Sequence, residues 1–204
     1  DWYWATESLP PLNWTPTVSS DADMQMLMVG TGPADNVESC ALFFESLIHQ
    51  ARERLWIVSP YFVPDVAIIH ALQLAAMRGV DVRIMLPELA DKHSIKLSSF
   101  TAIRETLPQG VQFYYYQRGF LHQKVLLVDD DIASVGTANL DNRSFRLNFE
   151  ISAVIYDQDF AQELADMLQQ DFQLCRQLLP AEVAKWSLLR RLLSRCAYLF
   201  APLQ

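Results

Sequence analysis

Two side chains in the second half of the chain have the types and the spacing for chemistry on a phosphoryl group. His122 and Lys124 stand two residues apart, and Asp129 follows in the pattern H-x-K-x4-D. Residues i and i+2 of a β-strand point to the same face, so we expect the imidazole and the ammonium to project together. The ammonium can neutralise phosphoryl oxygens while the imidazole attacks phosphorus or donates a proton. The pair therefore predicts phosphoryl transfer.

A group of polar residues follows this pair. Gly136, Thr137 and Asn139 form the pattern G-T-x-N, in which the Asn139 amide can add a hydrogen bond to the same phosphoryl oxygens. The carboxylate of Glu150 can accept from the second ring nitrogen of His122 and so fix the tautomer of the imidazole. The alternative is a surface histidine and lysine on an edge strand, with the aspartate of the pattern in a hairpin turn.

The elements that must position these residues alternate between strands and helices. Apolar runs bounded by glycine and proline predict strands, and apolar residues at helical spacing predict helices. The predicted strands are 24–29, 55–59, 80–86, 111–116, 124–128, 132–135 and 151–156, and the predicted helices are 37–53, 64–79, 94–107, 158–174 and 180–193. The strands 124–128 and 132–135 form a hairpin. This order predicts an α/β fold with a mixed, mostly parallel sheet flanked by helices on both faces.

The composition restricts the class of protein. The 204 residues are 51% hydrophobic and 20% charged, which is typical of one ordinary globular domain and excludes disorder. A net charge of −8 argues against a nucleic acid partner. The cysteines and histidines lack metal-ligand spacing, so we expect no metal site. We also expect the cysteines to be reduced thiols. No apolar stretch is long enough to span a bilayer. Because the chain begins with Asp1 rather than Met, we expect part of a longer protein.

The C-terminal segment concentrates basic and apolar residues in an otherwise acidic chain. Residues 181–200 predict a basic amphipathic helix that includes Trp186, Arg190, Arg191 and Arg195. Such a helix can lie in a membrane interface, with tryptophan and leucine inserted and arginine at anionic headgroups. The alternative is a helix packed on the domain with its arginines in solvent.

The sequence resembles a known superfamily over the segment that carries the chemistry. The run GFLHQKVLLVDDDIASVGTANLDNRSFRLNFE at 119–150 resembles the HKD motif of the phospholipase D superfamily. Together with SPYFVPD at 59–65, it resembles the A-type bacterial cardiolipin synthases. The similarity extends from about residue 24 to the C-terminus. Family members carry two membrane-spanning helices and then two HKD halves in one chain, and this chain resembles the second half.

The resemblance implies a reaction and a location. A phosphatidyl group moves from one phosphatidylglycerol to the hydroxyl of another, giving cardiolipin and glycerol through a phosphohistidine, without metal or cofactor. The implied partners are the phospholipid, the membrane surface, and a second HKD motif from the upstream half or from a second copy as a homodimer. The implied place is the bacterial inner membrane, with the catalytic part facing the cytoplasm. Residues 1–23 would then be an extended connector from the upstream half, and 24–204 the catalytic half.

The resemblance also implies roles for individual residues. The upstream histidine would be the nucleophile, so His122 would be the general acid and base, and Lys124 and Asn139 would bind the phosphate. Asp129 would orient its surroundings, and Glu150 would be the acidic partner of the histidine. Thr137 stands where relatives usually have serine, which retains a hydroxyl group.

Two neighbouring segments are expected to complete the site. Tyr61 and Phe62 follow a predicted strand end, where open α/β sheets place ligand sites, and the resemblance makes them a pocket wall. The alternative for both is a packed turn. We expect a polar brace behind the phosphate-binding asparagine, formed by Asp141, Arg143 and Ser144.

Two other functions remain open at this stage. One is a phosphodiesterase or nuclease of the same superfamily that works as a homodimer of single-motif chains. The other is a catalytically silent module that binds lipid or a partner. An isolated chain with one motif is expected to be weakly active or inactive unless it dimerises.

Overall fold

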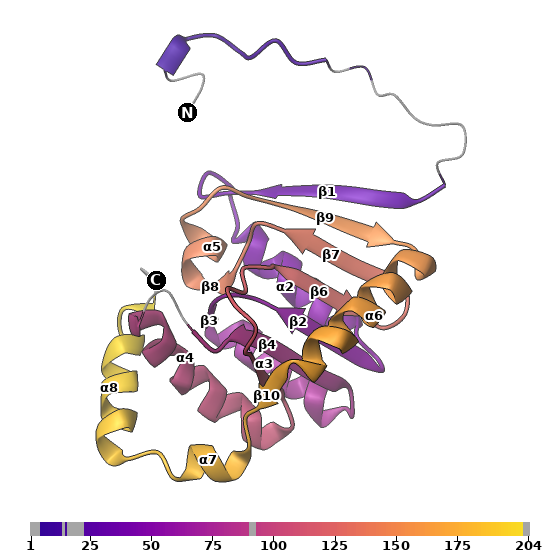
Figure 1. Cartoon of the computed structure of the whole chain (residues 1–204). Coiled ribbons are helices and arrows are strands. Elements are labelled where there is room, and N and C mark those ends of the chain that lie inside the picture. The colour runs from indigo at the N-terminus through magenta and orange to yellow at the C-terminus, as the bar shows by residue number, and fades with distance from the viewer. Residues whose placement is uncertain (1–4, 14, 16–22, 90–92, 202–204) are drawn as a thin grey trace.

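The computed structural model describes residues 5–13, 15, 23–89 and 93–201. The connector expected at 1–23 lies for the most part outside the described residues. An eight-stranded sheet forms the centre of the fold, in the order β1-β9-β7-β6-β2-β4-β5-β10 (Figure 1). Its strands are β1 (Gln25–Thr31), β2 (Arg54–Val58), β4 (Asp81–Pro87), β5 (Gln112–Tyr116), β6 (Val125–Val128), β7 (Ile132–Gly136), β9 (Glu150–Tyr156) and β10 (Cys175–Gln177).

The directions of the strands differ from the expectation. The sheet is mixed, as predicted, but "mostly parallel" is wrong. Strands β2, β4 and β5 pair in parallel, and the remaining pairings of this sheet in the described part of the chain are antiparallel. Parallel pairing needs a long crossover, which the helices between β2 and β5 provide, whereas the short β6–β7 turn can only reverse the chain. The predicted hairpin at β6 and β7 is confirmed.

Helices cover both faces of the sheet, as expected. One core lies against α2 (Ser39–Gln50), α3 (Val66–Met77) and α4 (His93–Thr106), and a second core lies against α6 (Gln158–Gln173). A one-turn 3-10 helix at Leu107–Gln109 follows α4. Strand β2 contributes to both cores, because Leu55 and Ile57 belong to the first and Trp56 and Val58 to the second. This alternation fixes the register of the central strands.

A small second sheet lies beside the carboxyl end of β2. It pairs β3 (Phe62–Val63) in parallel with β8 (Leu140–Asp141), which leads into the short helix α5 (Asn142–Arg146). The hydroxyl of Ser59 accepts a hydrogen bond from the Leu140 amide at 3.1 Å and donates to the Tyr61 carbonyl at 2.7 Å. These contacts bring the SPYFVPD segment next to the residues that follow the G-T-x-N pattern.

The C-terminal segment folds as two helices, where one helix at 180–193 was predicted. Helix α7 (Pro180–Ala184) ends before Lys185, and α8 (Leu188–Tyr198) begins after Ser187, whose hydroxyl accepts from the Arg190 amide at 3.2 Å. Helix α8 packs on α4 at the periphery of the molecule (Figure 1). Within the described residues, none of the helices is both long and apolar enough to cross a membrane.

Candidate active site

The predicted histidine and lysine lie side by side. Residues 122–124 form an extended segment immediately before β6, where the Gly136 amide donates to the Lys124 carbonyl at 3.1 Å. The Lys124 Nζ lies 2.8 Å from the His122 Nδ1 and donates to the His122 carbonyl at 2.9 Å. The imidazole is exposed, and the lysine is partly buried. The two side chains can therefore meet one phosphoryl group from the same surface.

This contact also constrains the histidine. A lysine ammonium has donors and no acceptor, and its Nζ is closer to Nδ1 than to Nε2, which is 3.5 Å away, so the contact favours the neutral tautomer that carries its proton on Nε2. The ring of Phe120 stacks on the imidazole, with centroids 5.3 Å apart and planes 15° apart. Phe120 is two residues before His122, so the alternation that pairs His122 with Lys124 also places Phe120, which the sequence reasoning missed.

The carboxylate of Glu150 has different partners from the expected one. It accepts from the Thr137 hydroxyl, and it accepts from the Asn148 side-chain amide at 3.0 Å. The Arg143 guanidinium donates to the Asn148 carbonyl oxygen at 3.3 Å. Glu150 was expected to hold a ring nitrogen of His122. In this structure the ring Nδ1 is instead in contact with Lys124. Asn148 was also missed, although it is two residues before Glu150, in the bend that leads into β9.

Asn139 is supported from behind by Ser144 and Asp141, whereas Arg143, the third residue of the expected brace, contacts Asn148. The Asn139 backbone amide donates to the Ser144 hydroxyl at 3.0 Å, and the Ser144 amide donates to the Asp141 carboxylate at 2.7 Å. Ser144 and Asp141 are buried, and burial raises the pKa of the Asp141 carboxyl. The Asn139 Oδ1 is buried without a hydrogen-bond partner among the described residues. A phosphate would use the Nδ2 hydrogens of this side chain, because Oδ1 is itself an acceptor.

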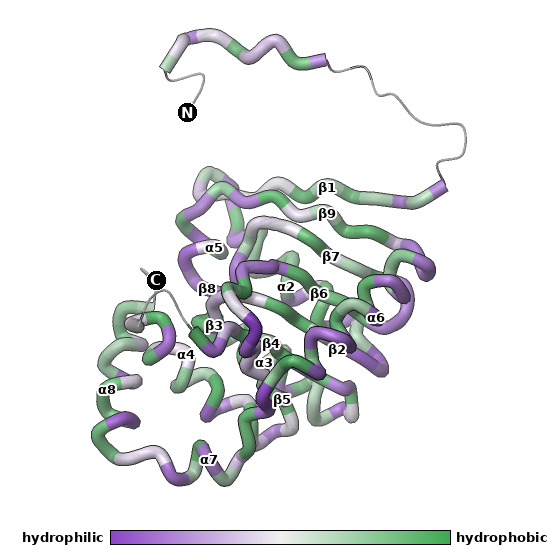
Figure 2. Tube along the Cα trace, viewed as in Figure 1, coloured by the Kyte–Doolittle hydropathy of each residue, from purple (hydrophilic) through white to green (hydrophobic). Residues whose placement is uncertain are grey.

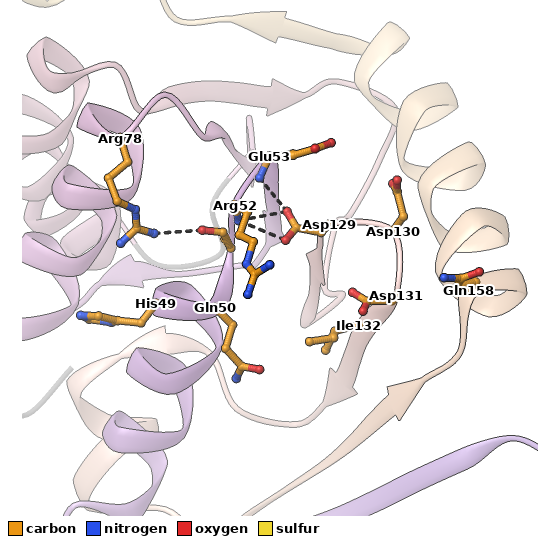
Figure 3. Close-up of a pocket in the computed structure, with 11 residues that line it drawn as sticks. His49, Gln50, Arg52, Glu53, Arg78, Asp129, Asp130, Asp131, Ile132 and Gln158 are labelled. Carbon is orange, nitrogen blue, oxygen red and sulfur yellow. Dashed lines mark hydrogen bonds between the residues drawn. The ribbon is translucent and has the colours of Figure 1, made fainter.

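The structure does not bring Asp129 to His122. The two residues lie at opposite ends of β6, and Asp129 adopts a left-handed backbone conformation with φ of 50° in the turn before β7. Its carboxylate accepts from the backbone amides of Arg52 at 3.0 Å and Glu53 at 2.8 Å (Figure 3). It also accepts from the backbone amide of Arg54 at 2.9 Å. These contacts attach the β6–β7 turn to the segment that leads into β2. In this structure Asp129 thus positions β6 and lies away from the histidine.

A polar hollow of about 930 Å³ surrounds this far end of β6. Asp129, Asp130, Arg52 and His49 are among the residues that line it (Figure 3). Size alone would make it a candidate binding site, but the side chains that can do phosphoryl chemistry are at the other end of the strand. We therefore assign the reaction to the exposed surface at His122.

The expected pocket wall is mostly core. Phe62 is 1% exposed, and its ring packs on Phe113 with centroids 5.2 Å apart. Tyr61 is half-buried against Val63 and Ile95. The crevice that touches both Tyr61 and Phe62 has a volume of about 20 Å³, which is room for one water molecule and not for a glycerol headgroup. Phe62 is therefore part of a packed turn, as the alternative had it. Its assignment to the wall of a substrate pocket is wrong in this structure.

The four residues expected at a membrane do not share one surface. The Arg190 guanidinium lies between the rings of Phe100, 4.0 Å away, and Trp186, 4.3 Å away. Arg191 donates to the Ala184 carbonyl at 2.9 Å, and Arg195 is exposed. Trp186 and Arg190 therefore face α4, which corrects their assignment as membrane-contact residues.

The chain is similar to known proteins over its whole length. The family model described as "Cardiolipin synthase, PLD-like domain" matches residues 44–172. The chain is 47% identical over 203 residues to cardiolipin synthase A of Pseudomonas putida strain W619, covering 100% of this chain and 42% of the relative. It is 48% identical over 203 residues to cardiolipin synthase A of Pseudomonas aeruginosa strain UCBPP-PA14, covering 100% and 41%. The chain thus spans about two fifths of the length of the curated relatives it matches.

Solved structures show the same fold at low identity. The phospholipase D family member Nuc from Salmonella typhimurium has a TM-score of 0.66 and 21% identity, covering 76% of this chain and 99% of that one. Phosphatidylserine synthase from Haemophilus influenzae Rd KW20 has a TM-score of 0.68 and 19% identity, covering 92% and 49%.

Proposed function

The chain belongs to the cardiolipin synthase family of phospholipase D-like proteins, and from this premise we propose that it is one catalytic half of a phosphatidyltransferase. In the proposed reaction a phosphatidyl group passes from one phosphatidylglycerol to the hydroxyl of a second, giving cardiolipin and glycerol. One histidine attacks phosphorus, and the P–O bond to the leaving glycerol breaks. The other histidine protonates that glycerol oxygen and later takes the proton of the acceptor hydroxyl. The acceptor oxygen then bonds to the phosphorus of the phosphohistidine, the P–N bond breaks, and the nucleophilic histidine is released.

The contact between Lys124 and His122 carries this proposal. An ammonium 2.8 Å from an exposed imidazole can bind the non-bridging oxygens of a phosphodiester while the imidazole transfers a proton. With Nδ1 held by lysine, the neutral ring presents its proton on Nε2, which suits His122 as general acid. The amide of Asn139, backed by Ser144, adds a further contact to the phosphate.

The proposal requires a second HKD motif. The curated relatives are more than twice as long as this chain, which supports an upstream half as the source. We place the assembled protein at the bacterial inner membrane with the catalytic part facing the cytoplasm, where its phospholipid substrate lies. Residues 1–23 are the proposed connector between the halves.

The second candidate is a phosphodiesterase or nuclease that works as a homodimer of single-motif chains. One observation favours it: this chain covers 99% of the solved Nuc chain, which leaves no room in that chain for a second half of this fold. The net charge of −8 disfavours a nucleic acid substrate. The rates of turnover of phosphatidylglycerol and of single-stranded DNA, compared in the same protein, separate the two candidates.

The test is a pair of substitutions in the assembled two-half protein. We expect His122→Gln and Lys124→Met each to lower cardiolipin formation from phosphatidylglycerol by about a hundredfold or more, because proton transfer and charge neutralisation at phosphorus are lost. The matched control is His70→Gln, at an exposed histidine on α3, which should leave the rate unchanged. Labelled phosphatidylglycerol, quenched during turnover and mapped, should leave its label on the upstream histidine. Wild-type turnover in His122→Gln would overturn the proposal.

A further inference from the structure

Helix α8 presents its apolar side to solvent. Leu188 is 81% exposed, Leu189 64%, Leu192 60% and Leu193 47%. Leu199 and Phe200, directly after the helix, are exposed on the same side by helical spacing, and so is Cys196. Figure 2 shows hydrophobic stretches along this helix at the edge of the molecule. A surface helix of a globular domain normally turns such a stripe toward the core, so this orientation needs an explanation.

The side of α8 that faces the domain is largely polar. The Arg190 guanidinium is held between the rings of Phe100 and Trp186. Ser194 is 1% exposed, and the Tyr198 hydroxyl donates to the Pro64 carbonyl at 3.1 Å. Cation–π contacts and hydrogen bonds thus fix the rotation of the helix about its axis. The leucines cannot turn inward without breaking them.

The charged residues that α8 and its flanking residues carry are all basic, whereas the far end of the stripe, at Leu199, lies beside a hollow lined by Glu38, Glu45 and Asp65. From Val183 to the C-terminus the sequence has no aspartate or glutamate, although the whole chain has a net charge of −8. Lys185 and Arg195 are exposed, and Arg195 flanks the leucines on the helix surface. Along Leu188–Leu193 the apolar stripe therefore has only basic charges on its own helix, and this combination is complementary to a surface that is apolar beneath and anionic above.

We propose that α8 lies in the plane of an anionic phospholipid surface, with its leucines between the acyl chains and with Arg195 and Lys185 at the headgroups. A protein partner would have to supply carboxylates at matching positions, whereas a bilayer containing phosphatidylglycerol offers negative charge along the entire helix. Because α8 is at the periphery and rests on α4, it can enter the headgroup layer while the sheet stays above it. The inference rests on the proposed function and deepens it, since the proposed substrate lies in that same surface. It is tested by vesicle binding instead of turnover, so that the inference and the proposed function can fail separately.

The experiment measures binding of the 204-residue chain to vesicles. We expect it to sediment with vesicles of phosphatidylglycerol and phosphatidylcholine in equal parts, and weakly with phosphatidylcholine alone. The double variant Leu189→Gln with Leu192→Gln should bind at least about tenfold more weakly, because two leucine side chains no longer leave water. The matched control is Leu74→Gln with Met77→Gln, at two exposed apolar residues of α3, and it should bind like the wild type.

A second measurement uses the exposed thiol of Cys196 and needs no substitution in the leucine stripe. Burial raises the pKa of the other two thiols, Cys40 to about 11 and Cys175 to about 12, so a maleimide fluorophore should label Cys196 selectively. The label should shift to the blue on adding phosphatidylglycerol vesicles. Unchanged emission, or wild-type binding by the leucine variant, would overturn the inference. The inference would also be overturned if the wild-type chain were a dimer, and the leucine variant were a monomer that still bound vesicles like the wild type.

Discussion

At the scale of single residues, the site is defined by the contact partners of its polar side chains. His122 and Lys124 were predicted to project together, and the structure places them in contact. The partner of Glu150 was not predictable, because Thr137 and Glu150 are far apart in sequence and meet where the chain leaves β7 and enters β9. The Thr137 hydroxyl donates to the carboxylate there, which leaves the imidazole to lysine. Residue types specified the chemistry, but the pairing depended on side-chain geometry across two strands.

Asp129 illustrates the difference between belonging to a motif and touching the reaction. We expect Asp129→Ala to lower the free energy of unfolding by about 2–4 kcal/mol, because three backbone amides lose their acceptor. Asp129→Asn should lose less, since asparagine keeps one acceptor oxygen and tolerates the left-handed conformation. Urea unfolding of the chain measures both.

The control for this prediction is turnover of the folded fraction in the assembled protein. If Asp129 only positions β6, the folded Asp129→Asn protein should keep most of its activity. A loss of activity as large as that of His122→Gln, without loss of stability, would show that Asp129 acts in the chemistry.

At the scale of elements, the sequence located most helices and strands but not every junction. Apolar spacing predicted a single helix through 180–193, and the structure ends α7 and starts α8 within that range. The reason is tertiary: Trp186 turns toward Phe100, and Ser187 caps the next helix. The two-residue strands β3 and β8 and the helix α5 are too short to carry a periodic signal, so they could not be predicted although they support Asn139.

The attachment of α8 depends on Arg190. We expect Arg190→Gln to loosen the helix, because a guanidinium stacked between two rings contributes about 1–2 kcal/mol and glutamine restores neither contact. Amide hydrogen exchange in 188–198 should become faster, while exchange in α6 stays the same.

The matched control for the loosened helix is Arg195→Gln, which removes an arginine of the same helix that is exposed. Exchange in α8 should not change in this variant. Equal acceleration in both variants would mean that net charge, and not the stacking of Arg190, holds the helix in place.

At the scale of the whole molecule, the chain has the features of half a site. Apolar residues flank the chemistry in exposed positions, with Phe120 67%, Phe149 78% and Ile151 49% exposed. Such a patch beside an open imidazole fits a surface that a second HKD motif covers. The resemblance to the phospholipase D superfamily implied the need for that motif, because the chain carries a single HKD motif. The sequence could not predict the patch, because the exposure of these residues depends on the packing of β1, β7 and β9.

The oligomeric state therefore controls activity of the chain alone. We expect a strictly monomeric sample to have little or no turnover of phosphatidylglycerol. Specific activity should rise with protein concentration if two copies pair, since each site then uses two copies of His122. Light scattering and rate measured on the same samples decide this. A monomer that turns over as fast as the two-half protein would contradict the prediction.

The strand that separates Lys124 from Asp129 has a further consequence for how the motif can vary. The four residues of the interval in H-x-K-x4-D are β6 itself, Val125–Val128, and all four are buried. Inserting or deleting one residue there would exchange the faces of the strand and move the anchored turn relative to His122 and Lys124. The motif thus depends on the number of residues between Lys124 and Asp129 as well as on the identity of its side chains. Sequences that keep its histidine, lysine and aspartate but change this interval should be read as a different arrangement.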